Sequence, residues 1–133
     1  MLDSAILCVD DEEIILRSLR DQIKKHFGNS YIYECAESGE EAWEVIEELT
    51  DDKIQIIIII CDWLMPGIKG DEFLIKVHQR FPKILKIMLT GQADTVAIER
   101  AFSEAKLDYY IPKPWDEAQL IAAIESGLKK RYD

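Results

Sequence analysis

The sequence predicts an α/β fold in which a parallel sheet carries helices on both faces, a doubly wound arrangement. The first observation is the apolar run 56–61, where five isoleucines and a cysteine favour a strand buried on both faces. The second is the alternation of strand-like and helix-like segments along all 133 residues. Because crossovers between parallel strands are right-handed, this order requires helices on both faces of the sheet.

The predicted elements form five consecutive strand–helix units. Short apolar segments predict the strands, and apolar residues at intervals of three and four predict the helices between them. Ser38 and Glu41 form a capping box that opens the second helix, and Asp94 is expected to cap the fourth. The predicted strands are 5–9, 31–35, 56–61, 84–90 and 107–111, and the predicted helices are 15–27, 38–49, 70–81, 94–104 and 115–130.

Composition and charge narrow the class of protein. A hydrophobic content of 48% suits one globular domain over residues 1–133, with a sizeable core. The chain lacks an apolar stretch of the roughly 18 residues that a membrane span needs, and its first residues carry no basic signal-peptide region. A net charge of -10 argues against direct binding to nucleic acid or to an anionic membrane surface.

Cys8, Cys35 and Cys61 all fall within predicted strands and lack the CxxC spacing of a metal site. An odd number of cysteines without that spacing fits packed thiols in a reducing compartment. We therefore expect a cytoplasmic location and no zinc.

Reactive side chains gather at the carboxyl ends of the predicted strands, which meet at one edge of a parallel sheet. They are Asp10 and Asp11 after the first strand, Asp62 after the third, Thr90 after the fourth and Lys113 after the fifth. Crowded carboxylates destabilise a fold unless a cation lies among them, and oxygen ligands favour Mg²⁺. One carboxylate could then form an aspartyl phosphate, whose oxygens a hydroxyl and an ammonium would bind. Each feature alone has an ordinary structural explanation, but their combination predicts phosphoryl transfer.

These residues together resemble the receiver domain of two-component response regulators, and the resemblance covers essentially the whole chain. The shared pattern is Asp10-Asp11, Asp62, Thr90, Lys113-Pro114 and the loop 62–67 followed by Gly70. The resemblance implies a flavodoxin-like three-layer sandwich, as in chemotaxis-type receivers, with strand order 2-1-3-4-5. It also implies a signalling switch that accepts a phosphoryl group from a sensor histidine kinase or a phosphotransfer protein.

The resemblance assigns the phosphoacceptor and the metal ligands. Asp62 would accept the phosphoryl group. Asp11 and Asp62 would bind Mg²⁺ directly, together with the backbone carbonyl of Leu64, and Asp10 would act mainly through water. The chemistry would be confined to the domain itself, which would phosphorylate and dephosphorylate its own aspartate rather than act as an enzyme on a separate substrate.

The resemblance also assigns the switch. Thr90 and Lys113 would bind the phosphoryl group, and Tyr110 would be the aromatic residue that moves inward with Thr90. The Lys113-Pro114 bond is typically cis in this family. A phosphoryl group adds about two negative charges, and satisfying its oxygens requires the surrounding loops to shift. The responsive face, 94–104 and 107–130, would control an output domain or a downstream protein, or form a homodimer.

Two other functions compete with the switch. A phosphatase of the haloacid-dehalogenase type also forms an aspartyl phosphate, but it needs a second aspartate where this chain has Leu64. A phosphorylation-independent interaction module usually lacks one of the site residues, and this chain keeps them all. The sequence leaves open the cognate kinase, the target, and whether the domain acts alone or belongs to a longer regulator.

Several other residues carry expectations of their own. Leu64 and Gln92 are expected to flank the path of the water that hydrolyses the phosphoryl group. Trp115 is interpreted as a packing aromatic at the start of the last helix. His26 and His78 are interpreted as partly exposed helix residues away from the site.

Overall fold

The structure, a computed structural model, describes residues 3–91 and 95–132, and within them five parallel strands form one sheet. The strand order is β2-β1-β3-β4-β5, which confirms the predicted doubly wound, flavodoxin-like fold. The strands are β1 (Ser4–Val9), β2 (Ile32–Ala36), β3 (Gln55–Cys61), β4 (Leu85–Thr90) and β5 (Tyr109–Pro112). The helices are α1 (Glu13–Phe27), the 3₁₀ turn η1 (Gly28–Ser30), α2 (Gly39–Asp51), α3 (Gly70–Arg80), α4 (Thr95–Glu104) and α5 (Glu117–Tyr132).

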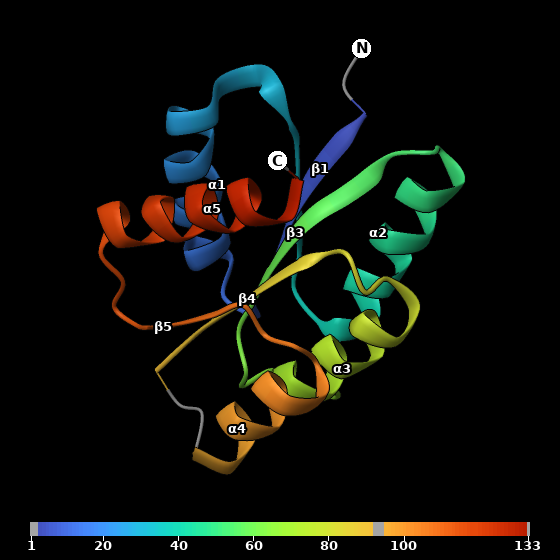
Figure 1. Ribbon diagram of the computed structural model, residues 1–133, viewed down its shortest axis with the longest axis vertical. Coiled ribbons are helices and arrows are strands. Elements are labelled where there is room, and N and C mark those ends of the chain that lie inside the picture. Colours follow the sequence, from blue (N-terminus) through green and yellow to red (C-terminus); the bar gives the residue numbers. More distant parts are fainter. Residues whose placement is uncertain (1–2, 92–94, 133) are drawn as a thin grey trace.

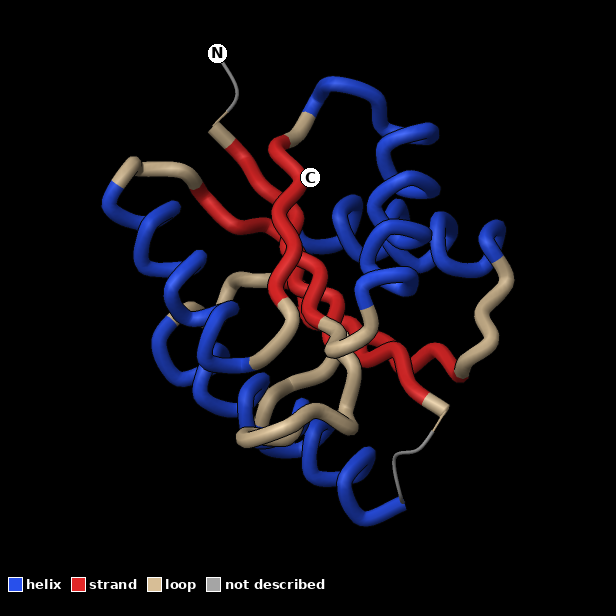
Figure 2. Tube along the Cα trace, turned by 180° about the vertical axis from the view of Figure 1, so that it is seen from behind, coloured by secondary structure: helices blue, strands red, loops and turns tan. Residues whose placement is uncertain are grey.

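The helices cover the sheet as two layers, with α1 and α5 on one face and α2, α3 and α4 on the other (Figures 1 and 2). Each layer closes over its own apolar cluster. The central strand β3 supplies both clusters, because Ile59 and Cys61 face the α2–α4 layer and Ile58 and Ile60 face the α1–α5 layer. All four side chains are fully buried, as predicted for a strand covered on both faces.

The fifth strand begins two residues later than the sequence predicted. Leu107 is used to end α4 instead, because its backbone N–H donates to the carbonyl of Ala101, at 3.1 Å. Lys106, with φ 54°, makes the left-handed turn that this helix ending requires. The expectation that Leu107 and Asp108 belong to the strand is therefore wrong, and pairing begins at Tyr109. All other predicted helix and strand boundaries lie within two residues of those observed. Asp94, the expected cap of α4, lies outside the described residues.

Local contacts explain where α2 begins and how it packs. The hydroxyl of Ser38 accepts a hydrogen bond from the backbone N–H of Glu41 at 3.1 Å, which confirms the predicted cap. Trp43 lies edge-on to Phe73 of α3, with ring centroids 5.6 Å apart, so it packs α2 against α3. Among the helices of the described residues, none is long and apolar enough to cross a membrane.

The cysteine side chains are packed thiols. Cys8 and Cys61 are buried and Cys35 is half-buried, and all three are free. Burial raises the pKa of the Cys61 thiol well above its ordinary value, and burial likewise raises the pKa of Cys8. Both thiols therefore stay protonated and contribute to the core as small apolar groups.

The two histidines lie on helices and are at least partly exposed, as interpreted from the sequence. His26 lies at the end of α1, with Nε2 3.4 Å from a carboxylate oxygen of Glu125 on α5. His78 of α3 is half-buried, and its Nδ1 is the one buried side-chain polar atom without a hydrogen-bond partner among the described residues. Burial, and then the nearby charge of Lys86, lowers the pKa of His78.

Lys86 is a fully buried cation near the amino end of β4. Its ammonium donates to the carbonyl of Ile84 at 2.7 Å. Burial lowers the pKa of Lys86 from 10.5 to about 8, although the carboxylate of Asp108 opposes the shift. The charged form of Lys86, at the amino end of β4, therefore destabilises the folded state.

This buried charge makes stability depend on pH in the alkaline range. Between pH 8 and 10.5 the unfolded chain binds more protons at Lys86 than the folded protein does, so the free energy of unfolding should rise with pH. The expected gain from Lys86 is on the order of 2–3 kcal/mol over that window. Urea unfolding of the native protein and of Lys86→Met from pH 7.5 to 10 measures it. The rise of the unfolding free energy with pH should be smaller in Lys86→Met and unchanged in Lys76→Met, which replaces an exposed lysine on α3. An equal rise in all three proteins would contradict the assignment of this pH dependence to Lys86.

Candidate functional site

Backbone hydrogen bonds continue one residue beyond two of the strands and fix the acidic side chains at the edge of the sheet. The backbone N–H of Asp10 donates to the carbonyl of Ala36 at 3.1 Å, and that of Asp62 donates to the carbonyl of Val9 at 3.0 Å. Asp10 and Asp62 thus leave adjacent strands side by side. Their carboxylates are held by the sheet rather than by a free loop.

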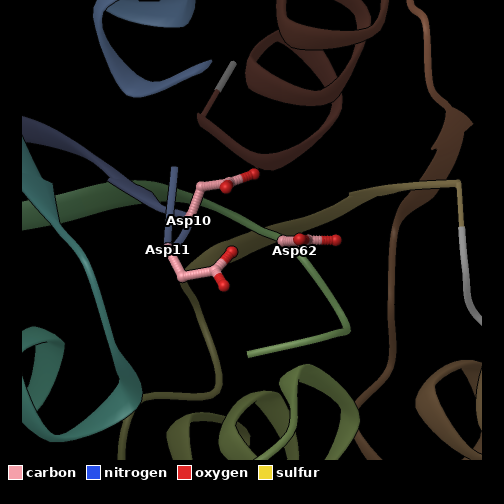
Figure 3. Close-up of side chains that lie close together, drawn as sticks. All are labelled: Asp10, Asp11 and Asp62. Atoms are coloured by element: carbon pink, nitrogen blue, oxygen red, sulfur yellow. The ribbon is translucent and has the colours of Figure 1, made fainter. Parts of the chain in front are cut away.

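Three carboxylates converge at this edge (Figure 3). One oxygen from each of Asp10, Asp11 and Asp62 lies within 4.8 Å of the others. Asp10 and Asp62 are 1% and 6% exposed, whereas Asp11 is exposed to solvent. A partly open cluster of carboxylate oxygens is a ligand set of the kind that Mg²⁺ prefers, because this ion keeps water and exchangeable oxygen ligands. The donor atoms therefore fit the predicted metal.

The ammonium of Lys113 lies between the two buried carboxylates. Its Nζ is 2.7 Å from Oδ2 of Asp10 and 3.3 Å from Oδ2 of Asp62. Burial raises the pKa of the Asp10 carboxyl, and the hydrogen bond from Lys113 opposes that shift. Burial tends to lower the pKa of Lys113, but the two carboxylates outweigh it and leave the pKa raised. Lys113 therefore carries a firm positive charge at the centre of the site.

Each buried carboxylate also accepts a backbone N–H. Glu12 donates to Oδ1 of Asp10 at 2.9 Å, and Trp63 donates to Oδ1 of Asp62 at 2.8 Å. The Asp62 side chain is therefore fixed through one oxygen by the next peptide, and its other oxygen faces Lys113. This arrangement orients Asp62 before any ligand arrives.

Thr90 and Tyr110, the predicted switch pair, are in direct contact. Thr90 is fully buried at the end of β4, and the hydroxyl of Tyr110 donates to its carbonyl oxygen at 3.2 Å. The Tyr110 ring is half-buried against the core of the α2–α4 layer. The backbone N–H of Lys113 reaches the same carbonyl at 3.3 Å. A movement of Thr90 would therefore reach both Tyr110 and Lys113.

A hollow of about 500 Å³ opens above these residues. Asp11, Asp62, Thr90 and Lys113 line it, and Leu64 stands at its mouth with 43% of its surface exposed. Gln92, which the sequence placed opposite Leu64, lies outside the described residues. Every other predicted site residue on β1, β3, β4 and β5 thus lies at or beside one hollow.

Comparison with known proteins identifies the family. Residues 6–125 match the model of the response regulator receiver domain. The chain belongs to this family. The receiver is 30% identical over 126 residues to the hydrogenase transcriptional regulatory protein HoxA of Cupriavidus necator, and the match covers 95% of the chain and 24% of HoxA. The receiver thus spans about a quarter of the curated relative that it matches.

Solved structures of receiver domains have the same fold. The signal receiver domain of an HD domain-containing protein from Pseudomonas fluorescens Pf-5 superposes with a TM-score of 0.86 at 26% identity, covering 99% of this receiver and 91% of that chain. A CheY-like receiver domain protein from Methanospirillum hungatei JF-1 gives a TM-score of 0.85 at 29% identity, with 98% and 97% covered. Residues 6–125 are therefore a receiver domain of the response-regulator family.

Two further features of the receiver site were expected from the sequence. The Lys113-Pro114 bond is cis, as the family resemblance implied. Trp115 is half-buried, and its indole N–H donates to the side chain of Gln22 on α1 at 2.7 Å. Trp115 therefore packs the start of α5 against α1, as interpreted from the sequence.

Gly70 lets α3 press against the backbone of Asp62 and Trp63. Its N–H donates to the carbonyl of Trp63 at 2.8 Å. A Cβ at Gly70 would lie 2.2 Å from the carbonyl oxygen of Asp62 and 2.7 Å from Cα of Trp63. Both contacts are with backbone, so they cannot be relieved by a change of rotamer.

Gly70→Ala should therefore destabilise the receiver by roughly 1–3 kcal/mol, because the new methyl group pushes the Asp62–Trp63 backbone away from α3. Gly91→Ala is the matched control at the same rim, since a Cβ there meets nothing closer than 3.6 Å. Its expected effect is within about 0.5 kcal/mol. Thermal or urea unfolding of both variants measures the difference, and equal stability of the two would show that the close approach of α3 is unimportant.

Proposed function

We propose that residues 1–133 form one receiver domain that works as a phosphorylation-dependent switch, with Asp62 as the phosphoacceptor. The observation that carries the proposal is the position of Lys113, whose ammonium contacts both Asp10 and Asp62 beneath an open hollow. An incoming phosphoryl group at Asp62 would meet a fixed positive charge at once. The membership of the chain in the receiver family supports the same function.

The three carboxylates, with the backbone carbonyl of Leu64, would hold Mg²⁺. Asp11 and Asp62 would be direct ligands and Asp10 would act mainly through water. When bound, the ion neutralises carboxylate charge and offers ligand positions to phosphoryl oxygens. The exposure of Asp11 keeps one side of the cluster open to solvent, which suits an ion that retains several waters.

In the proposed reaction, a carboxylate oxygen of Asp62 attacks the phosphorus of a phosphohistidine on a sensor histidine kinase or a phosphotransfer protein. An O–P bond forms as the P–N bond breaks, and the imidazole leaves with the donor. Lys113 would then donate to one phosphoryl oxygen and the hydroxyl of Thr90 to another. The backbone N–H of Trp63 keeps the carboxylate oriented during the transfer.

Loss of the phosphoryl group would occur by attack of water in the same hollow, with Leu64 at its mouth limiting access. Both steps take place on the domain itself, so we do not assign it activity toward a separate substrate. The acidic net charge and the absence of a membrane-crossing helix from the described residues fit a cytoplasmic module that binds neither nucleic acid nor membrane directly.

The output would come from the face formed by α4, β5 and α5. When Thr90 turns toward the phosphoryl group, the hydrogen bond from Tyr110 to its carbonyl carries the change to β5. That face would then bind an output domain or a downstream protein, or a second copy of the receiver. The relative HoxA is a transcriptional regulatory protein roughly four times as long, so an attached output domain is one form that this control could take.

Incubation with acetyl phosphate and Mg²⁺ should add one phosphoryl group to the native protein, seen as a single adduct by intact-mass spectrometry. The adduct should require Mg²⁺ and should be lost in Asp62→Asn, because the amide cannot act as the nucleophile. Asp51→Asn, at an exposed aspartate near the end of α2, is the control and should keep the adduct. An adduct that survives in Asp62→Asn would refute the assignment of the phosphoacceptor.

Mg²⁺ should also raise the melting temperature of the unphosphorylated receiver, because it binds the folded state. At a Mg²⁺ concentration one hundred times the dissociation constant, the free energy of unfolding increases by about 2.7 kcal/mol. Asp11→Asn should reduce the gain sharply, whereas Asp21→Asn, at another exposed aspartate, this one on α1, should leave it unchanged. Differential scanning calorimetry with and without Mg²⁺ measures both, and an undiminished gain in Asp11→Asn would exclude Asp11 as a ligand.

A further inference from the structure

A chain of hydrogen bonds leads from Asp62 to α4 through Trp63 and Asp71. Trp63 donates its backbone N–H to Asp62 at 2.8 Å and its indole N–H to Oδ1 of Asp71 at 3.0 Å. The other oxygen of Asp71 accepts from the guanidinium of Arg100 at 3.4 Å. The residues belong to the loop after β3, to the first turn of α3 and to α4, so three separate segments meet at one carboxylate.

Asp71 is buried, and its side chain contacts hydrogen-bond donors from two other segments of the chain. It is 6% exposed, although it is a charged residue in the first turn of α3. A buried carboxylate is costly unless hydrogen bonds and an opposite charge compensate it. The N-terminus of α3, the indole of Trp63 and the guanidinium of Arg100 supply that compensation. Loss of any one of these three contacts would change the geometry of the other two.

Trp63 is held tightly enough to transmit a displacement. Its carbonyl accepts from Gly70, and the ammonium of Lys69 lies 5.3 Å from the centre of its ring. Its indole is half-buried against the core of the α2–α4 layer. Because the peptide N–H and the indole of the same residue contact Asp62 and Asp71, a shift of the Asp62 carboxylate changes the geometry at Asp71.

The receiving element, α4, is lightly packed. Its buried side chains are Ala97 and Ala101, whereas α3 buries Phe73, Leu74 and Val77 completely. Val96 and Phe102 of α4 are 73% and 43% exposed. A helix that buries little apolar surface is held by a small free energy, so a single ion pair contributes a substantial share of its anchoring. The link from Arg100 to Asp71 is such an anchor.

We propose that Asp71 is a positioning residue that couples the phosphoryl state of Asp62 to the position of α4, through Trp63 on one side and Arg100 on the other. The inference rests on the proposed function and adds a second path to the one through Thr90 and Tyr110. Phosphorylation changes the charge and the hydrogen bonds at Asp62, the Trp63 peptide adjusts, and the contact between Asp71 and Arg100 strengthens or breaks as α4 moves.

Hydrogen exchange of the α4 amides, measured with and without beryllofluoride as a stable mimic of the phosphoryl group, tests the coupling. In the native protein, beryllofluoride with Mg²⁺ should change the exchange of residues 95–104. Arg100→Gln, at a half-exposed position, should fold normally and reduce that change at least about twofold. Trp63→Phe, which keeps the peptide N–H and removes the indole donor, should reduce it in the same direction.

Glu104→Gln is the matched control, because Glu104 pairs with the same guanidinium at 3.0 Å within α4 but does not touch Asp71. It should leave the response of α4 unchanged. A full response in Arg100→Gln or in Trp63→Phe would overturn the coupling, and so would an equal loss in Glu104→Gln. The mass of the acetyl phosphate adduct is measured in the same proteins: no adduct in the native protein would refute the proposed function itself, whereas normal adducts with unaltered α4 responses would refute only the coupling.

Discussion

The ammonium of Lys113 between the carboxylates of Asp10 and Asp62 is the interaction on which the site depends. Two carboxylates that are 1% and 6% exposed would repel each other and raise the cost of folding. A single cation 2.7 Å from one and 3.3 Å from the other makes the arrangement tolerable. Lys113 cannot fully neutralise the site, because Asp11 adds a third carboxylate at the same edge. The surplus negative charge is what a divalent cation would relieve.

The parallel sheet makes this concentration of charge possible. Five strands that point the same way deliver their carboxyl ends to one edge, and the backbone bonds of Asp10 and Asp62 extend the sheet by one residue into the site. The two apolar clusters beneath the rim stabilise the fold and offset the unfavourable free energy of the crowded charges. The rigid strands therefore make the polar rim possible, because the core fixes the carboxylates at distances that free loops could not maintain.

The sequence predicted the fold, and it predicted which polar side chains meet at one edge of the sheet, because both depend on strand ends. An isoleucine run, alternating elements and polar residues at four strand termini can be recognised without knowledge of packing. The end of α4 could not be predicted so well, because the choice between helix ending and strand at Leu107 depends on a left-handed turn at Lys106. Nothing local distinguishes a lysine that will adopt that conformation.

The link from Trp63 through Asp71 to Arg100 was missed for a related reason. An aspartate in the first turn of a helix is expected from the helix dipole alone, so Asp71 gives no signal of a further role. Arg100 lies 29 positions further along the chain, and only the packing of α3 against α4 brings the two together. Likewise, the buried ammonium of Lys86 follows from tertiary contacts, since a lysine within an apolar strand normally indicates an edge or a solvated face.

The kind of contact at α4 matters more for a switch than its strength. Apolar packing is nearly indifferent to charge, so a helix held by leucines and phenylalanines would not respond to a phosphoryl group several residues away. Polar contacts respond because their free energy depends on nearby charge and on hydrogen-bond geometry. In this receiver α3 is fastened by apolar side chains, while α4 buries two alanines and relies on an ion pair with Asp71. The element best suited to move is thus the one whose anchoring the site can alter.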